Sequence, residues 1–231
     1  ALISVNTGAE VTVDANSSVV TMDGATYPAI ILNKNEDGGV KTLNVYGKVA
    51  ATGMPGVQGN GADQDTSYVN IYSGASVTSN KLAMYLPQKC IVNVSGTVSG
   101  YCGIGIKSGT LNISGGLVQG TANDNVIGDK YSTTNGINYD GSAILVDSYI
   151  GYAGNVTINI TGGKVQSLYS TAIREIGNDA SKTLMVSLNV SGGEVYGASG
   201  AEAIAVRSTT RKTVSVSGGT FSSPVEKEYC T

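Results

Sequence analysis

Tyrosine, aspartate and asparagine side chains concentrate in one stretch of the chain, at about residues 120–142 and just after it. An aromatic ring can stack on the face of a sugar while carboxylates and amides hydrogen-bond to its hydroxyls. Long loops on a rigid framework are where binding residues tend to collect. We therefore predict a carbohydrate site here, although a solvated loop without function would have the same composition. The predicted ligand-binding residues are Asp124, Asp129, Tyr131, Tyr139, Asp140, Tyr149 and Tyr152.

A second group of oxygen-bearing side chains follows the pattern of half a calcium loop. The run Asn33-Lys-Asn-Glu-Asp37-Gly38 resembles the D-x-N-x-D-G order in which side-chain oxygens ligate Ca²⁺. The first aspartate of that pattern is missing, and an ordinary Asn/Gly turn accounts for the same residues. The alternatives are thus a turn and a Ca²⁺ site, with Asn33, Asn35 and Asp37 as the candidate ligands.

Groups that could catalyse a reaction are scarce. The chain has no histidine, which removes the usual general base at neutral pH and the commonest zinc ligand. Arg174 and Glu175 lie in one predicted strand and Arg207 near the next equivalent strand, but no run of aspartates accompanies them. An extra residue in the segment 172–176 predicts a bulge that turns the charges of Arg174 and Glu175 outward. We expect no enzymatic activity.

The composition argues against several other classes of function. With a net charge of −3, 13% charged residues and no basic patch, the chain lacks the features of a nucleic-acid-binding protein. It has no run of about 18 apolar residues, so we expect no insertion into a membrane. Low charge with many Ser, Thr, Asn and Gly residues suits an exported bacterial protein, extracellular or on the cell surface. The start at Ala1 without Met predicts a processed piece of a longer protein.

Three cysteines, an odd number, do not describe a disulfide framework. Their spacing also forms no metal-type cluster. Cys90 and Cys102 are either bridged or two small buried apolar residues, and the sequence leaves both alternatives open.

A repeat must position all of these groups. A segment of the form aliphatic-Asn-aliphatic-Ser-Gly, often with a second glycine, occurs seven times, and an apolar residue follows each copy. The copies begin at Leu43, Val69, Val92, Leu111, Ile158, Leu188 and Val214. Apolar and polar residues alternate within each copy, which is the period of a half-buried strand. Recurrence at intervals of roughly 20 to 30 residues predicts a stack of similar units.

A second series of predicted strands lies between these copies, at residues 29–32, 83–86, 103–106, 143–146, 172–176 and 203–206. Short strands without helical periodicity predict an all-β fold, a single-stranded right-handed parallel β-helix of about seven to eight coils. The glycine pairs are expected at corners, where positive φ or a close approach excludes a Cβ atom. We predict one domain over residues 1–231, with a capping coil at 1–26, an inserted loop at 120–142 and a C-terminal cap at 222–231.

Alternation assigns the residues of the repeat to two sides of the predicted sheet. The inward set is Leu43, Val45, Val92, Val94, Leu111, Ile113, Ile158, Ile160, Leu188, Val190, Val214 and Val216. The outward set forms one column of Asn44, Asn93, Asn112, Asn159, Asn189 and Ser215, and a second of Thr42, Thr110, Thr157, Ser187 and Thr213. Such a face suits an exposed sheet with side-chain ladders or a flat surface for a polysaccharide. Ice binding is disfavoured because the coil length is irregular.

The motif aliphatic-Asn-aliphatic-Ser-Gly-Gly-x-Val and the coil length resemble the right-handed parallel β-helix proteins of the pectate-lyase-like superfamily, over roughly residues 40–222. The spacing is most similar to that of non-catalytic, carbohydrate-binding cell-surface proteins of Gram-positive bacteria. The resemblance implies a non-catalytic surface domain for adhesion or carbohydrate binding, with a polysaccharide or a host or cell-surface glycan as partner.

Two alternatives remain, because a fold does not assign an activity. One is a relative of the polysaccharide lyases and hydrolases. The other is a structural stalk or one unit of a trimeric fibre. Self-association would be favoured if the outward apolar residues Ile31, Tyr85 and Leu145 are exposed.

Overall fold

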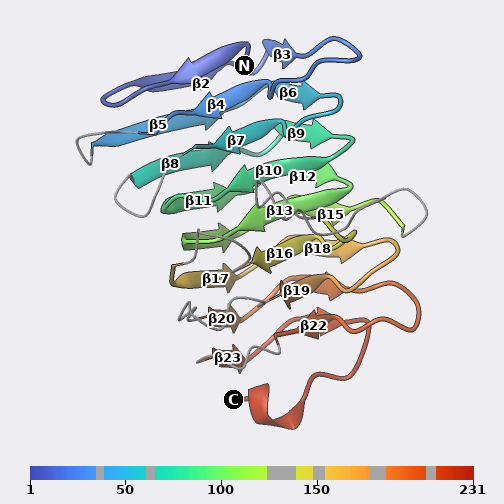
Figure 1. Cartoon of the computed structure of the whole chain (residues 1–231). Coiled ribbons are helices and arrows are strands. Elements are labelled where there is room, and N and C mark those ends of the chain that lie inside the picture. Colours follow the sequence, from blue (N-terminus) through green and yellow to red (C-terminus); the bar gives the residue numbers. More distant parts are fainter. Residues whose placement is uncertain (35–38, 61–65, 124–138, 148–153, 177–185, 207–211) are drawn as a thin grey trace.

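The protein is a rod in which each turn of the chain adds one strand to each of three sheets (Figure 1). The computed structural model describes residues 1–34, 39–60, 66–123, 139–147, 154–176, 186–206 and 212–231. These residues contain three parallel sheets of eight strands each, which we call A, B and C in the order in which the chain enters them. The described strands therefore make eight coils, and the predicted parallel β-helix is confirmed.

The strands are short and equivalent from coil to coil. Sheet A contains β1 (Ile3–Val5), β4 (Ile30–Leu32), β7 (Val57–Gly59), β10 (Leu82–Leu86), β13 (Cys102–Ile106), β16 (Ile144–Asp147), β19 (Ile173–Ile176) and β22 (Ile204–Ala205). Sheet B contains β2 (Glu10–Val13), β5 (Val40–Val45), β8 (Thr66–Ile71), β11 (Cys90–Val94), β14 (Gly109–Ile113), β17 (Val156–Ile160), β20 (Val186–Val190) and β23 (Lys212–Val216). Sheet C contains β3 (Ser18–Val20), β6 (Lys48–Ala51), β9 (Ser76–Ser79), β12 (Thr97–Gly100), β15 (Leu117–Gly120), β18 (Lys164–Ser167), β21 (Glu194–Tyr196) and β24 (Thr220–Phe221).

The core runs the length of the rod as columns of aliphatic side chains. Strand register pairs Val92 with Leu111, Leu111 with Ile158, and Ile158 with Leu188, so each column receives one residue from every coil. All of the predicted inward residues are buried except Val214, which is half-buried against the same core. The alternation of apolar and polar residues is visible in the sequence because the outer face of sheet B is polar.

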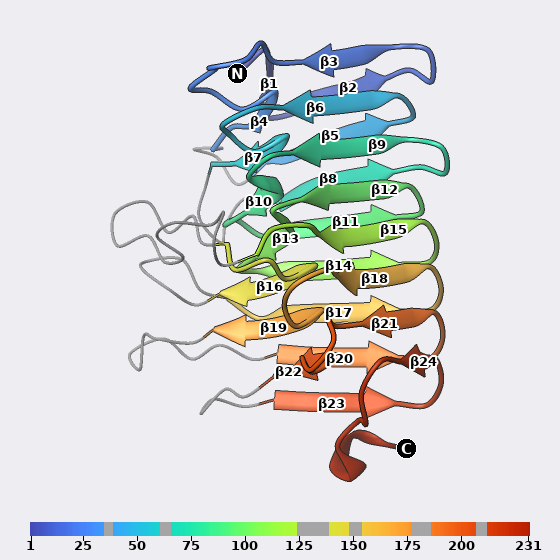
Figure 2. The same ribbon diagram turned by 90° about the vertical axis from the view of Figure 1, so that its right-hand side faces the viewer.

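The corners between sheets B and C are tight and lie one above another along one edge of the rod (Figure 2). We call the three kinds of connection the AB, BC and CA corners. Gly116, in a BC corner, has φ of +68°, and a Cβ atom there would collide with the carbonyl oxygen of Gly96 in the preceding coil. Both predicted reasons for glycine, positive φ and a close approach between coils, therefore operate at this position.

The two ends of the rod are built differently. Residues 1–26, predicted as a capping coil, contain β1, β2 and β3, which pair in register with the strands of the second coil. At the other end, a 3-10 helix η1 (Lys227–Tyr229) follows β24 and places Tyr229 against the core, 5% exposed. The backbone N–H of Thr231 donates to the Val216 carbonyl, so the C-terminal residues extend sheet B beyond β23.

The outer face of sheet A carries a second, smaller apolar cluster. It consists of Leu82, Tyr85, Cys102, Leu145 and Ile176, with Tyr139 packed against it. Tyr85 is 5% exposed and Leu145 fully buried, and Ile31 is half-buried. Tyr85 and Leu145 therefore present no apolar surface to another molecule.

Candidate functional site

Asparagine side chains form a continuous hydrogen-bonded ladder on the outer face of sheet B. The Nδ2 group of Asn70 donates to Oδ1 of Asn44 at 2.9 Å, and each later asparagine donates in the same direction, to the coil before it. The further rungs are Asn93 to Asn70, Asn112 to Asn93, Asn159 to Asn112 and Asn189 to Asn159, at 2.8 to 2.9 Å. The ladder ends at Glu10, whose Oε1 accepts from Asn44 at 2.7 Å. The predicted asparagine column is thus confirmed, and the structure adds Asn70 and Glu10 to it.

The second predicted column is less regular than expected. Register aligns Thr42 with Tyr68, Tyr68 with Ile91, and Ile91 with Thr110. The column therefore is not a continuous row of small hydroxyls. Tyr68 and Ile91 interrupt it.

Two tyrosines occupy the BC corner where later coils have serine or threonine. The rings of Tyr46 and Tyr72 stack with centroids 4.0 Å apart and an interplanar angle of 4°, and they are 42% and 36% exposed. The pKa of Tyr46 is raised, mainly by its hydrogen bond with the Tyr72 side chain. Partial desolvation and nearby negative charge raise it further, by less. The next coil has Ser95 at this position, which is too small to cover the second face of the Tyr72 ring.

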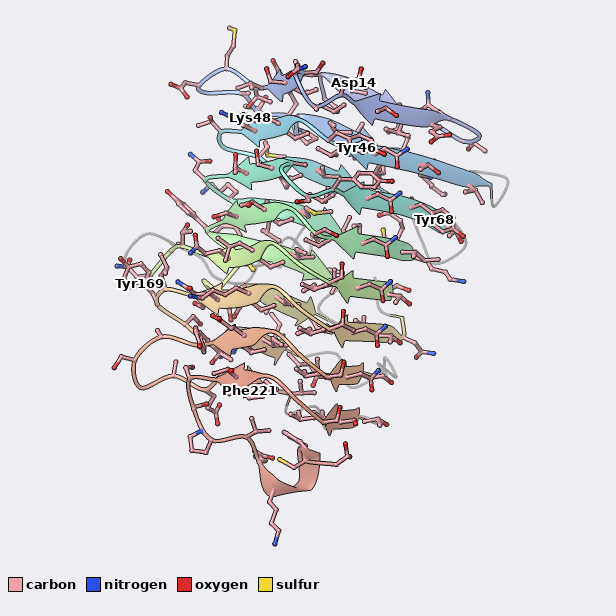
Figure 3. The ribbon with its side chains drawn as sticks, turned by 180° about the vertical axis from the view of Figure 1, so that it is seen from behind. Asp14, Tyr46, Lys48, Tyr68, Tyr169 and Phe221 are labelled. Carbon is pink, nitrogen blue, oxygen red and sulfur yellow. The ribbon has the colours of Figure 1, made fainter. Side chains whose placement is uncertain are left out.

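Tyr46, Tyr72 and Tyr68 lie on one side of the rod, over sheet B and its BC corner; Figure 3 labels two of them, Tyr46 and Tyr68. Tyr68 and Asn70 both point outward from β8, and Tyr72 follows directly after that strand. This group was not predicted from the sequence, because Tyr46 and Tyr72 were taken as variants of the motif serine. The same substitution in two successive coils was the signal that could have revealed a stacked pair.

The predicted carbohydrate site is only partly described. Asp124, Asp129, Tyr131, Tyr149 and Tyr152 lie outside the described residues. Tyr139 and Asp140 are described, and both attach the end of the insertion to the coils. The ammonium group of Lys81 lies 5.2 Å from the Tyr139 ring centroid and 5.8 Å from that of Tyr101, and it donates to the Tyr139 hydroxyl at 3.4 Å.

Asp140 makes the stronger attachment. Its fully buried side chain forms an ion pair with Arg174, with Oδ2 and Nη1 2.9 Å apart, and its Oδ1 accepts from the Ser142 backbone N–H at 3.0 Å. The carboxylate of Asp140 is thus engaged by protein groups and fixes the return of the chain into β16. The ion pair with Arg174 balances the charge of the buried Asp140 carboxylate.

Arg174 and Glu175, the two candidate catalytic residues that the structure describes, lie on opposite sides of β19. Glu175 pairs in register with Val146, a core residue, and is 7% exposed, so the prediction that a bulge turns it outward is wrong. β19 continues in regular register instead, which leaves Arg174 outward and Glu175 inward. Arg207 lies outside the described residues.

The candidate calcium ligands are also described only in part. The Nδ2 group of Asn33 donates to Oδ1 of Asn6 at 2.7 Å, which links two successive AB corners. Asn35 and Asp37 lie outside the described residues. Among the residues that the structure does describe, no three His, Cys, Asp or Glu side chains gather as a metal site.

The cysteines are free thiols. Cys90 and Cys102 are buried, Cys90 in the main core and Cys102 in the cluster outside sheet A, while Cys230 is exposed. Of the two alternatives that the sequence left open, burial without a bridge is therefore the one observed.

Comparison with protein-family models, curated proteins and solved structures found no match to this chain. In the described ranges, no helix has the length and hydropathy to cross a membrane.

Proposed function

We propose that the protein is a non-catalytic carbohydrate-binding domain that holds a polysaccharide against the outer face of sheet B. The observation that carries this proposal is the exposed Tyr46–Tyr72 stack beside the asparagine ladder. The likeness of the coils to the pectate-lyase-like β-helix proteins, and to their carbohydrate-binding members, supports it at the level of architecture. Such a function belongs outside the cell, on a bacterial surface or a host glycan.

The ladder leaves hydrogen-bonding capacity for a ligand. A primary amide has two N–H donors and two acceptor lone pairs, and an inner rung uses one donor and one lone pair. Each inner asparagine therefore keeps one donor and one acceptor, and these repeat about every 4.8 Å along the rod. Sugar hydroxyls, which both donate and accept, match such a row.

The tyrosines supply the apolar contact that a polysaccharide needs. Tyr68 and Tyr72 are four residues apart, which corresponds to about 13 Å of extended chain. Asn70 lies between them in sequence and shares the outer face of β8 with Tyr68. A sugar ring can pack against the open face of Tyr72 above Ser95, while the neighbouring amides bind its hydroxyls. This arrangement of ring, amide and ring suits an extended polymer lying along β8.

A glycan array tests the proposal. The protein is expected to bind at least one polysaccharide class, and replacement of Tyr46 and Tyr72 by alanine is expected to weaken binding tenfold or more. Tyr27→Ala is the matched control, because Tyr27 is also exposed, 39%, but lies in a CA corner of the first coil. Retention of full binding by the Tyr46/Tyr72 variant would refute the proposed site.

Two further outcomes would support the alternatives. Release of new reducing ends or unsaturated products from a bound polysaccharide would identify a lyase or hydrolase. A blank array together with a stable trimer in solution would identify a stalk or fibre unit. Both readouts can be taken from the same preparation, so the three functions are distinguishable.

A further inference from the structure

A groove lies at the ends of the last strands of sheet C. Tyr68, in β8, belongs to the other half of the rod. Its volume is about 550 Å³, and it is open to solvent. The residues that shape it are Gln166 and Leu168 around the end of β18, Tyr196 in β21, and Phe221 and Ser222 around the end of β24. Figure 3 labels Phe221 on this side, with Tyr169 at the neighbouring CA corner. A volume of this size is in the range of small-molecule sites in proteins.

Apolar surface is concentrated at the rim of the groove. Leu168 is 41% exposed and Tyr169, the next residue, is 57% exposed. Leu168 thus contributes exposed apolar surface to a groove that Tyr196 and Phe221 also line.

The groove is held in shape by hydrogen bonds on both sides. The Ser167 hydroxyl donates to the Gly141 carbonyl at 2.7 Å and accepts from the Ser170 backbone N–H at 2.8 Å, which fixes the corner that carries Leu168. The Gly197 backbone N–H donates to the Ser222 hydroxyl at 2.9 Å. These hydrogen bonds within the protein fix the walls of the groove, so binding here requires little ordering of the protein.

The Tyr196 ring has a charged neighbour on one side. The Lys164 ammonium lies 4.9 Å from the centroid of the Tyr196 ring, and Glu194 lies 3.8 Å from that ammonium. The cation covers part of the ring from one side, and its charge is balanced by the glutamate. The side chains that line the groove itself are uncharged.

We propose that this groove binds a neutral pyranose unit. The Tyr196 ring and Leu168 provide the apolar contact for the C–H face of a sugar, while the Gln166 amide and the Ser222 hydroxyl bind its hydroxyl groups. A charged sugar would find no unpaired opposite charge in the lining. An apolar peptide side chain would make no use of the Gln166 amide or the Ser222 hydroxyl, whereas the hydroxyls of a sugar can bind both.

This site is separate from the face of sheet B, and its occupation does not require the function proposed for that face. Where both sites bind parts of one polysaccharide, a single rod would hold the polymer at two points. Avidity would then exceed the affinity of either site.

Titration followed by NMR tests the proposal on the whole chain. The probes are methyl glycosides of glucose, galactose and mannose, with glucuronate as the charged control and a leucine-containing tripeptide as the apolar control. We expect saturable shifts of the Gln166 side-chain amide and the Leu168 methyl groups with at least one neutral glycoside, and weaker effects from both controls. Absence of saturable shifts with all neutral glycosides, or stronger saturation by glucuronate or the tripeptide, would overturn the proposal.

Variants separate this site from the other one. Tyr196→Ala and Gln166→Ala are each expected to weaken glycoside binding at the groove by fivefold or more, whereas Tyr196→Phe, which keeps the ring, should retain most of it. Gln119→Ala is the matched control, because Gln119 is the register partner of Gln166 one coil earlier and lies outside the groove. The Tyr46→Ala and Tyr72→Ala double variant should leave the groove shifts unchanged, so the two proposals can fail independently. A wild-type affinity in Tyr196→Ala, with the fold verified by its amide spectrum, would contradict the assignment.

Discussion

Cys90 shows what burial in this core does to a single ionisable group. Its thiol is fully buried, and this burial raises its pKa to about 12, while the positive charge of Lys41 acts in the opposite direction. Since the thiolate is the reactive form, the buried thiol is protected chemically as well as sterically.

We therefore expect one of the three thiols to react with a disulfide reagent in the native protein, and all three to react in denaturant. The fast thiol is Cys230, the exposed one, so Cys230→Ser should abolish the native reaction. Fast labelling of Cys90, mapped by peptide mass analysis, would contradict this prediction.

The raised pKa of Cys90 predicts that the stability of the protein depends on pH. As pH rises above the ordinary thiol value of 9.0, the unfolded chain loses the Cys90 proton while the folded protein keeps it, up to about pH 12. This favours the unfolded state, so the contribution of Cys90 to stability is complete below pH 9 and falls by about 1 kcal/mol per pH unit above it. Denaturant titrations of the wild type and of Cys90→Ala should show a steeper loss in the wild type.

The sequence alone predicts the position of some residues correctly and of others wrongly. Leu111 and Ile158 were assigned correctly because alternation specifies the side of a strand. Glu175 was assigned wrongly because an extra residue in the segment 172–176 was taken as a bulge, whereas β19 keeps regular register and pairs Glu175 with the core residue Val146. The Tyr46–Tyr72 stack depends on register between coils, which a single sequence does not contain.

Among the elements, the BC corner has the strictest requirements. Gly74 and Gly116 both occupy BC corners with positive φ, +85° and +68°. A Cβ atom on Gly74 would meet nothing within 4 Å, whereas on Gly116 it would collide with the backbone of Gly96. The pair therefore separates the conformational role of glycine from its role in coil-to-coil contact.

Gly74→Ala is expected to lower the free energy of unfolding by about 1 kcal/mol, because only the left-handed backbone conformation is penalised. Gly116→Ala should lower it by about 3 kcal/mol or more, since the backbone of two coils must also separate. Chemical denaturation of both variants measures the difference. Equal losses would show that the contact between the corners is unimportant.

The carbohydrate site predicted at the insertion could be derived from the sequence less completely than the coils. The CA corners and the insertion have no periodic pattern, so the contact of Lys81 with Tyr139 and the ion pair of Asp140 with Arg174 were not foreseen. Asp140 was chosen for its chemistry as a sugar ligand, but burial assigns it a structural contact.

In the whole molecule, each coil contacts mainly its neighbours, so stability depends on the end coils being covered. At the C-terminal end, Tyr229 covers the core from η1. Its loss should expose the last coil without greatly affecting coils in the middle of the rod.

Tyr229→Ala is therefore expected to accelerate hydrogen exchange in β23 and β20 by tenfold or more, while β11 and β14 stay protected. Tyr169→Ala, which removes a ring that is 57% exposed, is the matched control and should change neither region. Uniform acceleration along the rod would instead indicate that all eight coils unfold as one cooperative unit.

The CA corners differ greatly in length while the coils remain aligned. Between β12 and β13 the connection is Tyr101 alone, whereas between β15 and β16 it spans residues 121–143. Leu117 still pairs with Lys164, and Ile104 with Ile144. In engineering terms the rod is a display platform: a foreign peptide grafted at a CA corner would be presented at a fixed height along the axis. The length of the grafted peptide could then be chosen without redesigning the coils above and below.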